Sequence, residues 1–313
     1  MRVPGSSSFK HLELLLIFVV VVGYSSSVGA QVAAAQKMTT GSDSESLIAE
    51  GVDALERNDF PEARRKFLKA IELNPKNATA HTYLGIVDDR VGDLKSAESH
   101  FAAAVQADPR SASAHNNHGA SLLKLGRTKE AATEFVTSLN LDKNQPNALV
   151  NLAQLRLGSG SPADLAEALG LFDQAYRLRP DVETARALVV VSLKLSKRDA
   201  AAIYYREYST RLNQTDAQKP SVAIRTELGA ALLENDLVKE AILELTDAIG
   251  ADPSYPDAII RLAKAHLATN NIPLAGRVLE SAVARGVEAA PIYALLSSVY
   301  EKGNHIENAI PAM

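Results

Sequence analysis

The chain has 313 residues, of which 46 % are hydrophobic and 22 % charged, and its net charge is −4. Because its 33 basic and 37 acidic residues are spread along the sequence, no basic surface for a nucleic acid is indicated. The absence of cysteine excludes disulfides, thiolate metal ligands and a thiol nucleophile, and the scarcity of aromatic residues, at 5 %, favours closely packed helices over sheets.

The first thirty residues differ in character from the rest. Two basic residues, Arg2 and Lys10, precede an apolar run over residues 14–22, and small residues follow at 28–30. This order is typical of a secretory signal peptide, so residues 1–30 are predicted to be one. The run is much shorter than the roughly 20 apolar residues of a membrane-spanning helix. An uncleaved membrane anchor over residues 12–30 is the alternative, and residues 31–43 are expected to form a flexible leader.

After the leader, three residue types recur at one spacing. Glycine, alanine and phenylalanine each return every 34 residues, in a fixed order, and proline closes the first two units. The recurring residues are Gly51, Gly85 and Gly119; Ala63, Ala97 and Ala131; Phe67, Phe101 and Phe135; and Pro75 and Pro109. Such self-similarity predicts an array of identical supersecondary units.

The pattern resembles the tetratricopeptide repeat, whose 34-residue motif has a small residue at position 8, alanine at 20, an aromatic residue at 24 and proline at 32. Eight units are then expected to begin at Ser44, Ala78, Ala112, Pro146, Glu183, Val222, Pro256 and Ala290. The resemblance implies an all-α fold, an α-solenoid of about eight stacked helix-turn-helix repeats in a right-handed superhelix with a concave groove. Repeats one to five would cover residues 44–213, and repeats six to eight residues 222–313.

The residue types fit this packing. Small residues at positions 8 and 20 let the two helices of a unit approach closely, and the larger residue at 24 fills the space beside them. Repeat six keeps the pattern with Gly229, Ala241 and Pro253. Each unit leaves one face uncovered until its neighbour stacks on it.

Two regions interrupt the register. An insertion around residues 158–162 is expected to lengthen the turn between the two helices of repeat four. Repeat five is degenerate, and an irregular linker at residues 214–221 follows it, so a longer second helix or loop is expected there. Tyrosines Tyr204, Tyr205 and Tyr208 are either an aromatic binding anchor or, with two of them at i and i+4, packing residues.

The last repeat is incomplete. Its first helix is expected at residues 291–302 and its second begins at residues 305–309, but the sequence stops at Met313. One or more of four apolar side chains are therefore expected to be partly uncovered: Leu295, Leu296, Val299 or Tyr300. Either the sequence is a fragment or a partner supplies the final helix.

Signs of catalysis are scarce. There is no phosphate-binding loop, no Gly-x-Ser-x-Gly elbow and no His-Glu-x-x-His pair. His115 and His118 are three residues apart but lack an evident third ligand, which a zinc site requires. The sequence thus predicts no catalytic residue, no cofactor and no metal.

The family resemblance places the binding surface on the first helix of each repeat, which lines the concave groove. One subclass grips a terminal carboxylate with lysine, arginine and asparagine, and this clamp is absent. Its positions hold Ile48, Val52, Tyr83, Asn116 and Ala120 instead.

Another subclass, which includes the repeats of O-GlcNAc transferase, carries an asparagine ladder at position 6 that bonds a peptide backbone. Asn117 and Asn151 occupy that position here, and a carboxamide offers both a donor and an acceptor. The predicted peptide track comprises Asn116, Asn117, Asn151 and Gln154, edged by Arg90 and Lys124, with Tyr83 at position 6 of repeat two. Alternatively, the asparagines only bond neighbouring helices.

These features predict an exported, periplasmic or secreted scaffold that binds protein or peptide partners and catalyses nothing. Nucleic acid is not an expected partner, and a membrane would be contacted only through an uncleaved N-terminal segment. Two alternatives stay open: the substrate-binding N-terminal part of a larger enzyme, and a membrane-tethered assembly factor.

Overall fold

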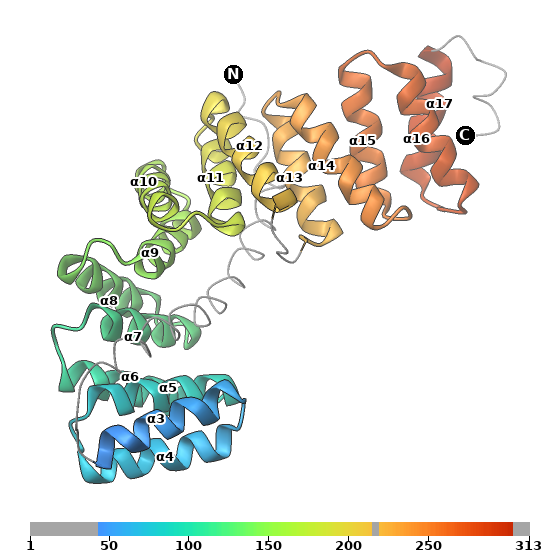
Figure 1. The fold of residues 1–313 in the computed structure, drawn as a ribbon. Coiled ribbons are helices and arrows are strands. Elements are labelled where there is room, and N and C mark those ends of the chain that lie inside the picture. Colours follow the sequence, from blue (N-terminus) through green and yellow to red (C-terminus); the bar gives the residue numbers. More distant parts are fainter. Residues whose placement is uncertain (1–42, 215–218, 303–313) are drawn as a thin grey trace. The chain divides into compact units, whose positions relative to one another are not determined.

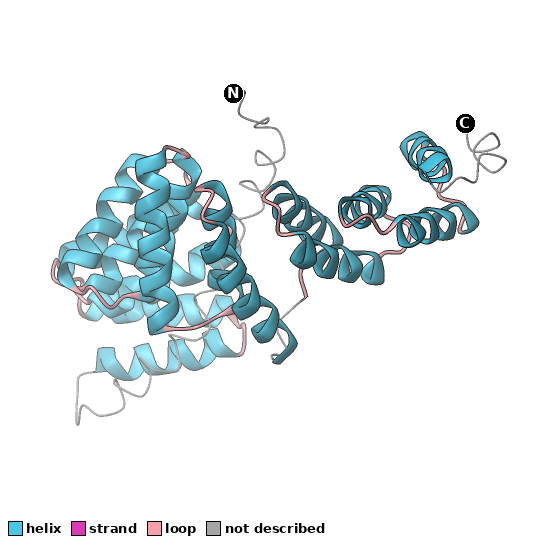
Figure 2. Cartoon of the chain, turned by 90° about the horizontal axis from the view of Figure 1, so that it is seen from above, coloured by secondary structure: helices cyan, strands magenta, loops and turns pink. Residues whose placement is uncertain are grey.

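The computed structural model describes residues 43–214 and 219–302, and within these ranges all regular structure is helical (Figure 2). The predicted signal peptide, residues 31–42 of the predicted leader and the second helix of the last repeat lie outside the described residues, whereas Asp43, the last residue of that leader, begins the first described helix. The described part forms two compact units, residues 43–180 and 181–302, each of which is a stack of helical hairpins. The prediction of an all-α solenoid is confirmed.

Fifteen helices, α3 to α17, follow one another in the described part of the chain (Figure 1). The first helices of the repeats are α3 (Asp43–Glu56), α5 (Ala78–Val91), α7 (Ala112–Lys124), α9 (Pro146–Ser159), α11 (Val182–Lys194), α13 (Val222–Glu234), α15 (Pro256–Ala268) and α17 (Ala290–Lys302). The second helices are α4 (Phe60–Leu73), α6 (Leu94–Ala107), α8 (Thr128–Leu141), α10 (Pro162–Leu178), α12 (Arg198–Gln214), α14 (Val238–Ala251) and α16 (Ile272–Ala284). Each first helix begins within one residue of the repeat start expected from the motif.

The turn inside each hairpin has one recurring conformation. Its central residue has a positive φ, between 55° and 86°, at Asn58, Gly92, Gly126, Gly160, Ser196, Asp236 and Asn270. Glycine, asparagine and aspartate tolerate this left-handed region better than other residues do, so Ser196 is the unusual member. In four hairpins the next residue caps the second helix, because its side chain accepts a hydrogen bond from a backbone N–H: Asp59, Asp93, Ser161 and Asn271.

The two helices of a hairpin meet where glycine faces an aromatic ring. A Cβ atom added to Gly85 would lie 2.8 Å from Cε1 of Phe101, closer than real Cβ contacts allow. The same relation joins Gly51 to Phe67 and Gly119 to Phe135, and in repeat six Gly229 faces Leu245. Every one of these larger side chains is completely buried. The absent glycine side chain therefore makes the space that the ring fills.

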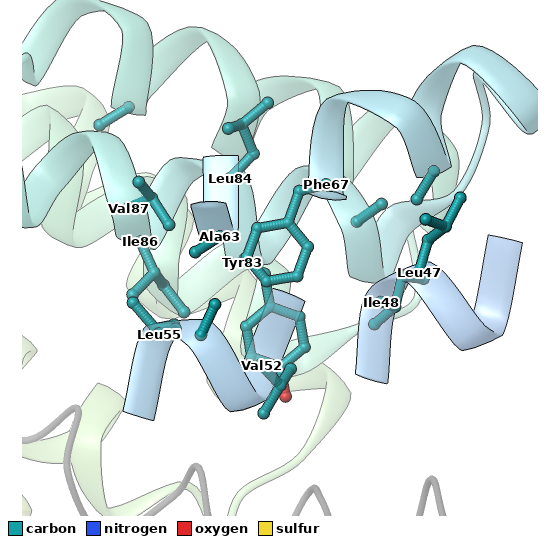
Figure 3. Packing of buried hydrophobic residues seen from close by; sticks show 14 of the residues in the cluster. Leu47, Ile48, Val52, Leu55, Ala63, Phe67, Tyr83, Leu84, Ile86 and Val87 are labelled. Carbon is teal, nitrogen blue, oxygen red and sulfur yellow. The ribbon is translucent and has the colours of Figure 1, made fainter. Parts of the chain in front are cut away.

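Neighbouring hairpins of the first unit are joined through apolar contacts. The rings of Phe67 in α4 and Tyr83 in α5 stack with centroids 5.4 Å apart, which connects repeat one to repeat two (Figure 3). Leu55, Ile86 and other apolar side chains of α3 to α6 complete this cluster. The first two hairpins thus share one apolar core.

The insertion in repeat four does not lengthen the turn as expected. The turn between α9 and α10 consists of Gly160 and Ser161, which matches the turn of Gly92 and Asp93 between α5 and α6. Instead α10 has 17 residues where α6 has 14, so the extra residues extend the helix. Pro162 can begin it because the first helical position needs no N–H donor.

The last described helix is better covered than the sequence indicated. Leu296 and Val299 of α17 are buried, at 5 % and 3 % exposure, in a cluster with residues of α15 and α16. Leu295 and Tyr300 are half-buried and pack against the same cluster. Of the four side chains named from the sequence, Leu295 and Tyr300 are thus partly uncovered, and Leu296 and Val299 are not.

Candidate functional site

The predicted peptide track lies on two neighbouring first helices. Asn116 and Asn117 belong to α7, and Asn151 and Gln154 belong to α9. Asn151 Nδ2 donates a hydrogen bond to Asn116 Oδ1 at 3.0 Å, and both side chains are buried. Asn116 Nδ2 in turn donates to Asn117 Oδ1 at 3.5 Å. The Asn116–Asn151 pair therefore bonds neighbouring helices, as the alternative interpretation of the asparagines had it.

Gln154 stands out among these polar side chains. Its Oε1 atom is shielded from solvent, and in the described part of the chain no group donates a hydrogen bond to it. A buried amide oxygen without a donor costs about 1–3 kcal/mol. Gln154 therefore has a hydrogen-bond acceptor that the described part of the chain does not use, and Asn117 of the same track is half-buried.

The residues expected at the edges of the track have different surroundings. Lys124 Nζ donates to both carboxylate oxygens of Asp89, at 2.5 and 2.7 Å, and this ion pair joins α7 to α5. Arg90 is exposed. Tyr83, 6 % exposed and stacked on Phe67, has its ring in the core.

The two polar pairs between first helices share one spacing. Asp89 and Lys124 are 35 residues apart, and so are Asn116 and Asn151. A contact at one repeat length plus one residue connects the same two faces of successive first helices. Polar side chains therefore cross-link α5 to α7 and α7 to α9 along the surface that carries the track.

The histidines of repeat three are engaged in hydrogen bonds within the protein. His115 contacts the Pro109 carbonyl oxygen through Nε2, at 3.1 Å, and Glu134 through Nδ1, at 2.6 Å. His118 lies 3.4 Å from both Glu98 and Glu134. No three histidine or carboxylate side chains of the described residues converge as a metal ion would require.

The second unit contains a buried polar cluster that the sequence did not predict. Tyr205 and Tyr208 of α12 donate hydrogen bonds to the two oxygens of Glu244 in α14, at 3.1 and 3.3 Å. Arg225 of α13 donates to Glu244 at 3.3 Å and to Asp247 at 2.9 Å. Burial raises the pKa of Glu244, although Arg225 and the tyrosine hydroxyls act in the opposite direction.

This cluster explains two of the three tyrosines. Tyr205 and Tyr208 are buried, so they are packing residues and not an exposed binding anchor. A signal for their role was present in the sequence. Ala201 and Tyr205, four residues apart, repeat the spacing of alanine and aromatic residue seen in the regular repeats. Repeat five is therefore less degenerate than it looked.

No helix in residues 43–214 or 219–302 has both the length and the hydrophobicity needed to cross a membrane. The apolar run near the N-terminus lies outside this part.

Comparison with known proteins gives a consistent result for the fold. Three family models match: Tetratricopeptide repeat over residues 84–148 and again over residues 232–299, and TPR repeat over residues 54–87. No curated protein matches the sequence.

Three similar solved structures cover nearly the whole of their own chains. PilF from Pseudomonas aeruginosa is 20 % identical, with a TM-score of 0.58, and the match covers 69 % of this chain and 94 % of PilF. PilW, described as a type IV pilus biogenesis factor, is 16 % identical, with a TM-score of 0.57 and coverage of 70 % and 98 %. YrrB, described as a TPR protein with an unusual peptide-binding site, is 19 % identical, with a TM-score of 0.50 and coverage of 61 % and 95 %.

Proposed function

The chain is a tetratricopeptide-repeat protein, and we propose that it acts as an exported scaffold that binds an extended peptide or a partner subunit along the first helices of its repeats. The peptide backbone would lie across α7 and α9, where Asn117 and Gln154 offer hydrogen-bonding groups. Such a scaffold binds without catalysis.

The observation that carries this proposal is the unpaired acceptor of Gln154. A buried amide oxygen without a donor lowers stability, and a backbone N–H of a bound peptide would remove that cost. The neighbouring Asn116–Asn151 bond joins α7 to α9, so the backbone that carries Gln154 is held in place, and a rotation of the Gln154 side chain would bring its shielded oxygen to the peptide. Preorganisation of this kind reduces the entropy lost on binding.

Two further observations support the choice of partner and compartment. YrrB, whose fold is similar, is described as having a peptide-binding site, and PilW is described as a pilus biogenesis factor. The signal-peptide pattern of residues 1–30 supports export. An exported repeat protein that binds peptides or subunits fits the assembly of a structure outside the cytoplasm.

A phage-displayed library of random 12-residue peptides provides a probe for this surface. Peptides selected on the wild-type protein should bind the Asn117→Ala/Gln154→Ala variant about 5- to 160-fold more weakly, since two hydrogen bonds of about 0.5–1.5 kcal/mol each would be lost. Gln106→Ala, at an exposed position of the second helix α6, is the matched control and should bind as wild type does. Unchanged affinity in the double variant would rule out the track.

A further inference from the structure

A chain of ring nitrogens and a carboxylate runs through repeat two. His81 Nε2 lies 3.1 Å from the carbonyl oxygen of Pro75, and His81 Nδ1 lies 3.4 Å from His100 Nδ1. On its other side, His100 Nε2 faces Asp88 Oδ2 at 3.7 Å. The second oxygen of Asp88 accepts a hydrogen bond from Arg64. Asp88 is completely buried, and Oδ2 has no hydrogen-bond partner within the described residues.

The Pro75 carbonyl fixes where the protons lie. A carbonyl oxygen only accepts, so His81 Nε2 must carry its proton, and a neutral His81 then has a lone pair at Nδ1. That lone pair requires a proton on His100 Nδ1, which leaves a lone pair on Nε2 of a neutral His100. This second lone pair faces a carboxylate oxygen, which also only accepts when ionised.

We propose that repeat two contains a buried proton-binding site, in which His100 Nε2 and Asp88 Oδ2 share a single proton. Without the proton, two acceptors face each other in a buried environment. With it, the chain of hydrogen bonds becomes continuous from the Pro75 carbonyl through His81, His100 and Asp88 to Arg64. Because Pro75 and Arg64 belong to repeat one, the loaded site connects repeat one to repeat two.

The charged surroundings agree with a site for one proton. Burial raises the pKa of Asp88 to about 6, with Asp93 acting in the same direction and the Arg64 guanidinium opposing it. Burial also lowers the pKa of His100, as do the nearby His81 and Arg64, while Asp93 opposes them. The environment therefore disfavours both an ionised carboxylate and a charged imidazole, and one shared proton removes both charges from the pair.

An Asp88→Asn variant of the full chain separates this site from an ordinary ion pair. The asparagine amide would donate to His100 Nε2 without any added proton, and its oxygen would still accept from Arg64. In wild-type protein, an NMR titration should show one transition shared by the His100 ring and the Asp88 carboxyl carbon near pH 6. In Asp88→Asn the His100 transition should move down by about one pH unit or more. Asp89→Asn, which alters the adjacent ion pair with Lys124, should leave it unchanged.

Stability at pH 7.5 gives an independent readout. Asp88→Asn should unfold at a urea concentration no lower than wild type, whereas Asp88→Ala should unfold at a clearly lower one. An Asp88→Asn variant as unstable as Asp88→Ala, or an unmoved His100 transition, would overturn the proposal. If the variant does not fold, the NMR titration of the Asp88 carboxyl carbon in the wild type is the remaining test. A titration midpoint below pH 4 would contradict a shared proton.

Discussion

Two contacts between helices in this chain differ in their chemistry. One lies within the hairpin of repeat two, and the other, the polar joint, lies between repeats five and six. In repeat two, Gly85 lacks the side chain that would collide with Phe101, and the helices meet through an apolar ring. In the later joint, α12 is three residues longer than α6, and Tyr205 and Tyr208 reach Glu244 through their hydroxyl groups. Shape complementarity holds the first contact, and a buried hydrogen-bond network holds the second.

The two arrangements should fail in different ways. An apolar contact loses stability in proportion to the misfit that a mutation introduces. A buried polar network depends on every member, since a lost partner leaves the others desolvated and unpaired. The largest losses are therefore expected in the polar joint.

Removing the carboxylate at the centre of the joint should have the largest effect. Glu244→Ala leaves Arg225 and two tyrosine hydroxyls without their buried acceptor, and the free energy of unfolding should fall by about 3–5 kcal/mol. Urea denaturation followed by circular dichroism would measure it. Thr246→Ala, an exposed position on the same helix, is the control and should change stability by no more than about 0.5 kcal/mol. A loss as small as that of the control would show that the network is dispensable.

Filling the space in repeat two should cost less. In Gly85→Ala the new methyl group meets the Phe101 ring, and we expect a loss of about 1–3 kcal/mol. Repeat seven shows the compensation, because it has Ala263 and Leu279 at the equivalent positions, both completely buried. The loss of unfolding free energy in Gly85→Ala/Phe101→Leu should therefore be about 1 kcal/mol smaller than the sum of the losses in the two single variants. Additive effects in the double-mutant cycle would contradict a direct fit between the two side chains.

The pH dependence of stability should distinguish the polar joint from the apolar one. Burial raises the pKa of Glu244 in the folded chain, so its protonated form stabilises the fold. This contribution is complete below the pKa of the unfolded chain, about 4.3, and is lost as the pH rises through the folded pKa. Glu244→Gln should lack it, with a difference of about 1.4 kcal/mol for each unit of pKa shift. If the unfolding free energies of the wild type and Glu244→Gln change in parallel from pH 4.5 to 7.5, the pKa of Glu244 is not raised in the folded chain.

Replacing a glycine that lies outside both contacts should stabilise the protein instead of destabilising it. Gly170 lies in α10, and a Cβ atom added there would meet nothing within 4 Å. Gly170→Ala should raise the free energy of unfolding by about 0.5–1 kcal/mol through helix propensity alone. Thermal denaturation of Gly170→Ala and Gly85→Ala compares the same substitution at a position without a facing ring and at one with a facing ring. A loss of stability at residue 170 would show that the cost at residue 85 is not specific to its ring.

The sequence predicted the hairpins because their signals are local. A glycine and a phenylalanine 16 residues apart, with alanine between them, specify one helix pair in each of the first three repeats. The repeat starts expected from the motif lie within one residue of the observed starts of the first helices. The position of the insertion was harder, because Gly158-Ser159-Gly160-Ser161-Pro162 contains turn-forming residues, and only packing shows that Gly158 and Ser159 end α9.

The site was less accessible to sequence reasoning. The asparagines of the track were found by position, but their hydrogen bond to each other depends on how far α7 and α9 are apart. The role of Glu244 has no local signal in the sequence, because its partners come from α12 and α13, 19 to 39 residues earlier in the chain. Burial of a charge is a property of the assembled repeats.

The left-handed turn inside each hairpin determines how such a chain can be lengthened. Because one residue with positive φ, followed by the start of the second helix, defines the turn, added residues enter the helix, as they do in α10. One helical turn has 3.6 residues, so an insertion of three or four residues keeps the buried side chains of the second helix on the same face. For protein engineering, the start of a second helix is a site where a short segment can be inserted without separating the hairpin.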